Sequence, residues 1–333
     1  MPGPEFFAEA DPGQARCGEL ASLQPANPFA TFPYLQAERS FGGGAWLLGC
    51  ASGGELRYGC LGFLRSGRLD RRLTLPSLPR AEEPFWSGLA EFCRKKGVTI
   101  LELNTFASPA VAIPSLGEER RRVERHEFVV PMDGPGDGLL QQMHPNHRQM
   151  VRKGMKAGLE VRVTRDPGYL KEHVAVMRSS LTRRESRGED VWSEPDAELL
   201  RPYLDGVCRL FQAVAGAETV SSMTVAESSG GGYLHTAGTS PEGMRIGASH
   251  FLLYEILKAC RQNGGRIFNL GGVSDLSSGL ALYKRHFGAH PVTLEAAEFD
   301  VGAAWRRVVR ISAGKLRDWA ARENWRWRRR IPG

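Results

Sequence analysis

The chain has 333 residues, of which 41% are hydrophobic and 24% charged. This is the composition of a globular protein with a substantial core, and it excludes a disordered chain. The longest apolar runs are far below the ~20 residues of a membrane-spanning helix, and no apolar secretory segment stands near the N-terminus. We therefore expect a cytoplasmic protein, and the length predicts two or three domains or one double-sized unit.

The net charge of +7 is concentrated near the C-terminus. Residues 305–331 contain ten Lys or Arg and two acidic residues, so this segment carries +8 and the rest of the chain −1. Tryptophan and arginine alternate in Trp325–Arg330, which suits stacking and phosphate contacts with RNA. The pattern also suits an anionic membrane surface, or a helix that packs on its own domain with its basic residues outward.

The six cysteines form no C-x-x-C pair and have no histidine at metal-ligand spacing. Of the eight histidines, His235 and His286 are kept as residues of interest. We therefore expect no metal, and cysteines that act as small buried apolar residues.

Two stretches that lie 167 residues apart read alike. Cys93–Leu103 and Cys260–Leu270 share Cys, Arg, Gly, Ile and Leu at five of eleven positions. Each stretch ends an amphipathic helix at a glycine and then enters a short apolar strand. The two helices are expected over about 84–96 and 248–263.

Strand-like pairs separated by Gly-rich turns precede both helices, at 46–50 and 56–64 and again at 219–227 and 233–238. Each half therefore reads strand, turn, strand, helix, strand. A repeat of this length is too long for a solenoid unit, so it predicts two related α/β halves.

The boundary between the halves is expected near 118–138, where a charge run precedes a turn-rich segment. Residues 139–157 read as helical apart from His144-Pro145, and 193–212 read as another helix. The expected units are residues 1–132, residues 133–303, and a basic helical tail at residues 304–333.

Three segments resemble the FemAB-like transferases of the GNAT acyltransferase superfamily. Residues 146–159 (NHRQMVRKGMKAGL) resemble that family's basic helix, and residues 247–257 with 269–272 resemble its helix and glycine-ended strand. The most specific segment is Gly279–Gly288 (GLALYKRHFG), which is similar to the family pattern G-L-x-x-(F/Y)-K-x-x-F-G. Order and spacing fit over roughly residues 30–300.

The resemblance implies two tandem GNAT-like α/β domains and transfer of an aminoacyl or acyl group to an amine. The expected donor is aminoacyl-tRNA, and no further cofactor is required. The expected acceptor is an amine of a peptide, a peptidoglycan precursor or a natural product. The alternatives are an acyl-CoA-dependent N-acyltransferase and a non-catalytic module that binds RNA or a membrane.

Acyl transfer to an amine needs a neutral amine near the carbonyl and donors that stabilise the oxyanion. Lys284 is the first candidate for such a donor, or for holding a carboxylate or phosphate. Tyr283 is a candidate proton donor to the leaving oxygen or sulfur, and Asp275 a candidate base or amine-binding group. Gly271 and Gly272 follow a strand and allow close backbone approach to a ligand. The structural alternatives are a surface lysine, a packed tyrosine and an ordinary turn.

Arg148, Arg152 and Lys156 recur at intervals of four residues and predict a basic stripe on one face of a helix. Such a stripe suits the phosphates of tRNA or of a nucleotide-linked acceptor, or it is simply a solvated face. Gly247 and Ser249 begin the second-repeat helix, where GNAT enzymes bind the CoA pyrophosphate through backbone N–H groups. The sequence there only approximates the pattern R/Q-x-x-G-x-G/A, which weakens the CoA alternative.

Overall fold

The computed structural model describes residues 3–133, 138–188, 195–273 and 275–302. The elements of the first half are β1 (Glu5–Ala10), α1 (Gln14–Leu23), α2 (Phe32–Arg39), β2 (Gly44–Ser52), β3 (Glu55–Ser66), β4 (Arg71–Leu75), α3 (Glu83–Lys96), β5 (Ile100–Leu103) and β6 (Glu118–Pro131). Those of the second half are α4 (Gly138–Gln142), α5 (Pro145–Lys156), β7 (Glu160–Thr164), α6 (Leu170–Glu185), α7 (Ala197–Asp205), β8 (Cys208–Ala215), β9 (Glu218–Ser228), β10 (Gly231–Thr239), α8 (Pro241–Ile246), α9 (Ala248–Gln262), β11 (Ile267–Val273), α10 (Gly279–His286) and β12 (His290–Asp300).

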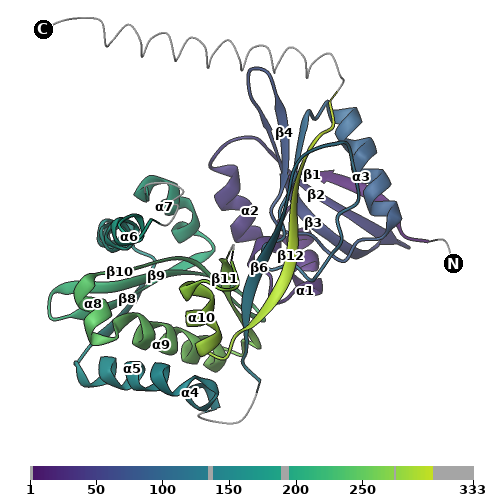
Figure 1. The fold of residues 1–333 in the computed structure, drawn as a ribbon. Coiled ribbons are helices and arrows are strands. Elements are labelled where there is room, and N and C mark those ends of the chain that lie inside the picture. The colour runs from purple at the N-terminus through teal and green to yellow at the C-terminus, as the bar shows by residue number, and fades with distance from the viewer. Residues whose placement is uncertain (1–2, 134–137, 189–194, 274, 303–333) are drawn as a thin grey trace, which may run out of the picture.

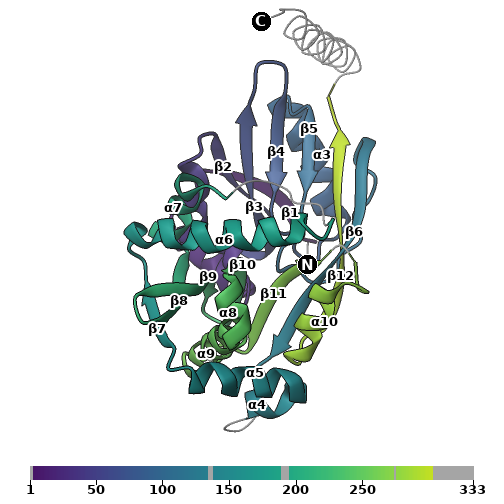
Figure 2. The ribbon, with the colours of Figure 1, turned by 60° about the vertical axis from the view of Figure 1, so that its left-hand side comes forward.

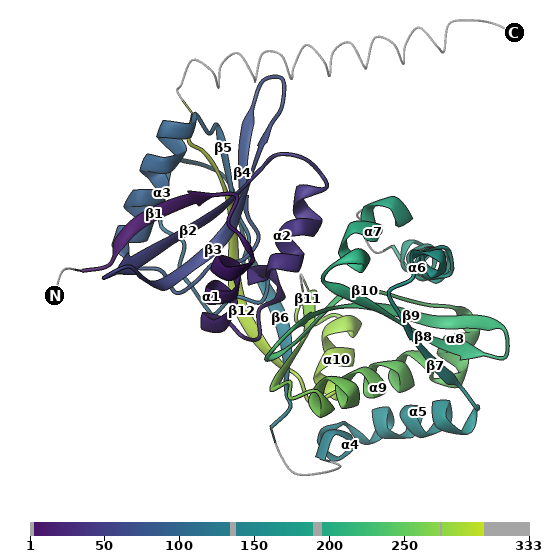
Figure 3. The same cartoon turned by 180° about the vertical axis from the view of Figure 1, so that it is seen from behind.

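The described strands form one mixed sheet, in the order β1-β2-β3-β4-β5-β12-β6-β11-β10-β9-β8-β7. Helix α3 covers one face of the first half, and α1 and α2 cover the other (Figures 1 and 3). In the second half α9 packs on one face and α6 crosses the other (Figure 2). The expected α/β class is therefore confirmed. None of the described helices has the length and apolar character needed to cross a membrane.

The internal repeat is present in the fold. Helices α3 and α9 and strands β5 and β11 confirm the predicted helix and strand of each half. In each half the strand before the helix pairs in parallel with the strand after it, β4 with β5 and β10 with β11.

The sequence reading missed β4, and it therefore aligned β2 and β3 with β9 and β10. The sheet order instead matches β2, β3 and β4 with β8, β9 and β10. Strand β4 is only five residues long and begins Arg71-Arg72, so its apolar pattern is weak.

The last strands of the two halves exchange places. Strand β12 pairs with β5 of the first half, β6 pairs with β11 of the second, and β6 and β12 pair with each other from end to end. These two strands run side by side through the middle of the molecule (Figure 1). The division of the chain at residues 132 and 303 stays a prediction, and the sequence did not indicate this exchange.

Two segments differ from the expected local pattern. The charge run at 118–125, where we expected the boundary between the halves to begin, is the first part of β6, where Arg120 pairs with Glu298 and Arg122 with Glu295 of β12. Cross-strand ion pairs of this kind allow a charged segment to lie inside a sheet. The helix expected over 193–212 ends at Asp205, because Gly206 breaks it and β8 follows. The basic tail at 304–333 lies outside the described residues.

The second half contains a buried imidazole between α6 and the sheet. His173 is fully buried, and its ring nitrogens lie 2.7 Å from the Ser222 hydroxyl and 2.8 Å from the Thr236 hydroxyl. Burial lowers the pKa of His173 to about 4. In an unfolded chain the pKa of histidine is ~6.5. The unfolded state therefore binds the proton first as the pH falls, and the folded state loses stability from pH ~6.5 downward.

We predict that His173→Gln reduces the acid sensitivity of the fold. Between pH 6.5 and 5 the free energy of unfolding of the wild type should fall by about 2 kcal/mol more than that of the variant. Urea unfolding at both pH values measures the difference. The matched control is His290→Gln, because His290 is exposed. Equal losses in wild type and His173→Gln would contradict the prediction.

Candidate functional site

A buried carboxylate lies where the two halves meet. Glu127 of β6 is 1% exposed and accepts four hydrogen bonds. Its Oε1 accepts from the Tyr233 hydroxyl (2.9 Å) and from Arg125 Nη2 (2.8 Å). Its Oε2 accepts from Asn269 Nδ2 (2.7 Å) and from the backbone N–H of Ala107 (3.0 Å). Two carboxylate oxygens have about four acceptor sites, so this carboxylate is fully bonded.

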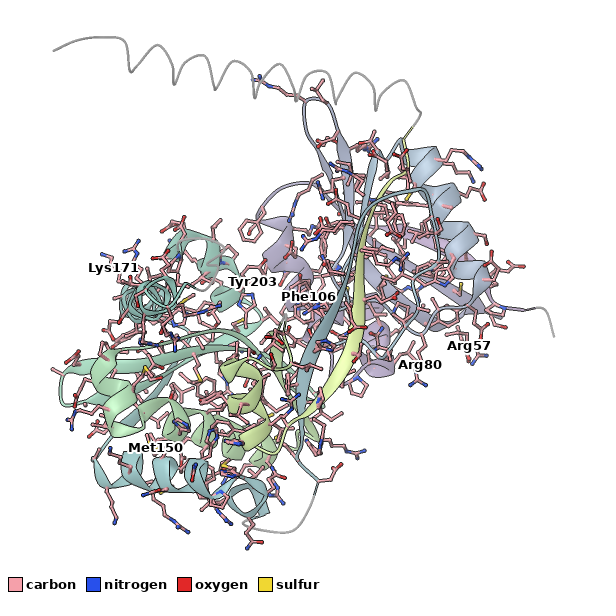
Figure 4. All side chains as sticks on the ribbon, viewed as in Figure 1. Arg57, Arg80, Phe106, Met150, Lys171 and Tyr203 are labelled. Carbon is pink, nitrogen blue, oxygen red and sulfur yellow. The ribbon has the colours of Figure 1, made fainter. Side chains whose placement is uncertain are left out.

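The first half supplies part of this arrangement. Ala107 follows β5 and has a φ of 51°, in the left-handed region that few residues other than glycine adopt. Phe106 lies beneath the Arg125 guanidinium, whose central carbon is 4.2 Å from the ring centre. Figure 4 shows Phe106 between the two halves.

Lys284 approaches the same region from α10. It is 5% exposed, and its Nζ donates to the carbonyl oxygens of Gly271 and Gly272, both at 2.9 Å. Burial lowers the pKa of the Lys284 amine to about 7, while the charge of Glu127 raises it and that of Arg125 lowers it. We call Lys284, Arg125, Glu127, Tyr233 and Asn269 the junction cluster.

A bulge in β11 provides the two carbonyl groups. The pairing of β11 with β6 shifts between Asn269 and Gly272, and Gly271 within the bulge has a φ of +73°. A residue with a Cβ pays about 1–2 kcal/mol for such a conformation, which explains a glycine here. The Gly271 N–H donates to Asn269 Oδ1 at 2.8 Å, so Asn269 joins Glu127 to the backbone that holds Lys284.

The two neighbouring candidates on α10, Tyr283 and Lys284, lie in different surroundings. Lys284, Gly271 and Gly272 are brought together at the junction. Tyr283 instead packs against His147 of α5 and His250 of α9, with ring centres 5.1 Å apart in both cases. Burial raises the pKa of Tyr283, and a hydrogen bond with Ser249 at the start of α9 lowers it.

Gly247 begins α9 and is enclosed by α5. Its φ is +81°, and a Cβ at this position would lie 2.5 Å from the carbonyl oxygen of Met150. Figure 4 shows Met150 on α5. The backbone at the start of α9 therefore contacts α5 directly.

The basic stripe lies on the outer side of α5. Arg152 and Lys156 are exposed and Arg148 is half-buried. Among the residues that the structure describes, no carboxylate pairs with any of the three. Their role in substrate binding stays a prediction.

Asp275 is exposed in the turn between β11 and α10. Its carboxylate accepts from the backbone N–H and the hydroxyl of Ser277, and these bonds lower its pKa. The structure does not bring Asp275 into the junction cluster, and its role as a base stays a prediction.

Sequence reasoning missed Arg125, Glu127, Tyr233 and Asn269. A signal for two of them was present, because Glu127 and Asn269 each lie in an apolar strand segment, HEFVV and IFNL. A polar residue inside a buried strand needs partners, so it marks a place where elements meet. His235, which the sequence singled out, is the extra residue of a bulge in β10, and burial lowers its pKa to about 4.

His286 stacks on His144 at 4.0 Å between ring centres, beside the Tyr283 group. Groups of three or more metal-binding side chains do not occur in the described part of the chain.

Residues 142–285 match the acetyltransferase (GNAT) domain family. The fold is shared with the crystal structure of FemX, with a TM-score of 0.68 and 14% identity over 87% of this chain and 96% of that one. The structure of L-PGS from Bacillus licheniformis gives a TM-score of 0.52 and 14% identity, over 91% of this chain and 96% of that one. A tandem GNAT protein from the clavulanic acid biosynthesis pathway gives the same values for score and identity, 0.52 and 14%, over 91% and 100%.

No curated protein sequence matches the chain significantly. At 14% identity the structural similarities establish the fold, which is GNAT-like and shared with FemX. Together with the match to the GNAT domain, they support an acyltransferase.

The buried amine predicts a pH dependence of stability. The pKa of Lys284 is about 7 when folded and ~10.4 in an unfolded chain, so the unfolded state holds more protons between these values. The stability of the folded state therefore rises with pH across this window.

We predict that the increase in stability with pH is absent in the Lys284→Met variant. Between pH 7 and 9 the free energy of unfolding of the wild type should increase by about 2 kcal/mol relative to the variant, whatever the offset between them at pH 7. Chemical denaturation at the two pH values measures it, with Lys258→Met on the exposed side of α9 as the control. Parallel curves for wild type and Lys284→Met would refute a lowered lysine pKa.

Proposed function

We propose that this chain is a FemAB-like acyltransferase that forms an amide bond, with aminoacyl-tRNA as the donor and an amine as the acceptor. The acceptor is an amine of a peptide, a peptidoglycan precursor or a natural product. The observation that carries the proposal is the Lys284 amine, buried in a FemX-like fold with two carbonyl partners.

The number of N–H groups on Lys284 gives it a specific role. A protonated lysine has three N–H donors, and the carbonyl groups of Gly271 and Gly272 take two. The third has no acceptor among the described residues, so it is available to an oxyanion. The acceptor amine attacks the ester carbonyl carbon, the C–N bond forms, and Lys284 stabilises the negative oxygen. The C–O bond then breaks, and the proton lost by the amine goes to the departing ribose oxygen.

The packing around α9 favours aminoacyl-tRNA over acyl-CoA. In GNAT enzymes the CoA pyrophosphate binds at the start of the corresponding helix, where backbone N–H groups are free. Here α8 leads directly into α9, and Gly247 is in contact with the backbone of α5. The exposed cations Arg152 and Lys156 lie on the same helix α5, and they suit the phosphates of a nucleic acid. The match to an acetyltransferase domain keeps acyl-CoA as the second candidate donor.

We predict that Lys284→Ala lowers kcat by about 10²–10³-fold, because it removes one oxyanion donor. The protein should remain folded, and KM should change little. The matched control is Lys171→Ala, since Lys171 is exposed on α6, away from the junction (Figure 4). Full activity of Lys284→Ala would sink the role of this lysine.

The donor is identified by titrating aminoacyl-tRNA and acetyl-CoA against the full chain at two salt concentrations. We expect tight tRNA binding that weakens with salt, no saturable CoA binding, and amide formation with an amine acceptor. Saturable CoA binding with weak, nonspecific tRNA binding would assign the chain to the acyl-CoA-dependent enzymes instead. A third outcome is binding of RNA or vesicles that survives Lys284→Ala, requires residues 304–333, and is accompanied by no transfer. That outcome would identify a non-catalytic binding module.

A further inference from the structure

We propose that Glu127 is a positioning residue, which holds the Lys284 amine in place through Asn269 and the β11 bulge and favours its protonated form. This inference rests on the proposed function in that Lys284 is the group it serves. Glu127 itself belongs to β6, the strand that the second half shares with β12.

A continuous chain of short contacts connects the two residues. Glu127 accepts from the Asn269 amide, Asn269 accepts from the Gly271 N–H, and the Gly271 carbonyl accepts from Lys284. Because the Asn269 amide is bonded on both its nitrogen and its oxygen, its orientation is fixed. The backbone of Gly271 is thereby restrained, because its N–H is bonded to Asn269 and the pairing with β6 resumes at Gly272. Loss of the Glu127 carboxylate would remove the acceptor of the Asn269 side-chain amide. The side chain that holds the Gly271 backbone would then no longer be fixed.

The charge of Glu127 acts on the same amine. The charged and titratable side chains around Lys284 are Glu127 and Arg125 of β6 and Tyr233 of β10. On α10 itself Arg285 lies over Phe128, the ring that also faces the Lys284 amine. Glu127 is the one carboxylate in this set. Without it, an ammonium group would face a guanidinium in a buried site, and desolvation would favour the neutral amine.

The neutral amine is the wrong form for an oxyanion donor. It has two N–H groups and a lone pair, and the two carbonyl groups of β11 use both N–H groups. Only the protonated form keeps a third N–H. A carboxylate that favours protonation therefore preserves the group that the proposed reaction needs.

The first half of the chain contributes directly to this arrangement. Ala107 donates its N–H to Glu127 from a left-handed conformation, and Phe106 supports the Arg125 guanidinium. A strained residue persists where its surroundings over-determine it, and such positions gather at functional sites. Ala107 and Asp11 are the non-glycine residues with positive φ in the described ranges, and Ala107 is the one at the junction.

The test measures the titration of Lys284 directly, without any substrate. The chain has eight lysines, so NMR of protein labelled with ¹⁵N and ¹³C at lysine gives a small set of amine signals. The signal that disappears in Lys284→Arg assigns Lys284. Its pKa is then followed in the wild type, in Glu127→Gln, and in Glu124→Gln as the matched control on the exposed side of β6.

We expect Glu127→Gln to lower the pKa of Lys284 by at least about one unit, and Glu124→Gln to leave it unchanged. An unchanged pKa in a folded Glu127→Gln protein would overturn the proposal. Because the readout needs no turnover, this result is independent of whether the chain transfers an acyl group. If the chain proves inactive, the proposed function fails while the Glu127–Lys284 coupling stands or falls on the titration alone.

A second comparison covers the case in which Glu127→Gln does not fold, since that change leaves Arg125 buried without its partner. Arg125→Gln and the double variant Arg125→Gln/Glu127→Gln differ in the carboxylate alone, and neither leaves an unpaired guanidinium. The pKa of Lys284 should be lower in the double variant by at least about one unit. Equal values in the two would overturn the proposal.

Discussion

The exchange of β6 and β12 is the constraint on which the rest of the molecule depends. Each half would need a sixth strand to cover β5 or β11, and each takes that strand from the segment that sequence order assigns to the other. The two halves therefore share one hydrogen-bonded ladder instead of meeting at a packed interface. A ladder fixes register residue by residue, because a slip of one position moves every side chain to the opposite face. Strand β6 can thus carry Glu127 to the junction and hold it opposite the β11 bulge.

This placement explains how a lysine can be buried without a direct ion pair. A charged amine in a poorly solvated site is costly, and its pKa falls unless other groups compensate. Two backbone carbonyl groups accept hydrogen bonds from Lys284, and the nearby negative charge of Glu127 favours the protonated form of this lysine. The same carboxylate pairs with Arg125, so the three groups carry a net charge of +1 when Lys284 is protonated. The result is an amine whose pKa of about 7 lies near neutral pH rather than far above it.

The sequence predicted the parts of the fold that depend on local pattern. Apolar periodicity that ends at a glycine predicted helices α3 and α9. The segment Gly279–Gly288, which resembles the FemAB-like pattern, indicated Lys284. Strand β4 was missed because two of its five residues are arginines. Strand β6 was missed because its charge run did not indicate a strand, and only the fold shows the ion pairs to β12 that offset this charge. Glu127 and Asn269 stand in the sequence as polar residues inside apolar strands, yet only the long-range pairing brings them within 2.7 Å. No local rule indicates which strand a buried carboxylate will face.

We assign no role in the proposed reaction itself to the segment from β1 to β5, but this part of the chain does more than support the fold. The loop after β5 supplies the Ala107 N–H, which bonds to Glu127, and the Phe106 ring, which packs against Arg125. Any movement between the halves would alter these contacts and therefore the protonation of Lys284. A substrate that bound at the junction would also change the solvation of the Lys284 amine, and therefore its protonation. The duplicated architecture thus gives the second half a means of tuning its amine that a single GNAT domain, with no strand from a partner half, would not have.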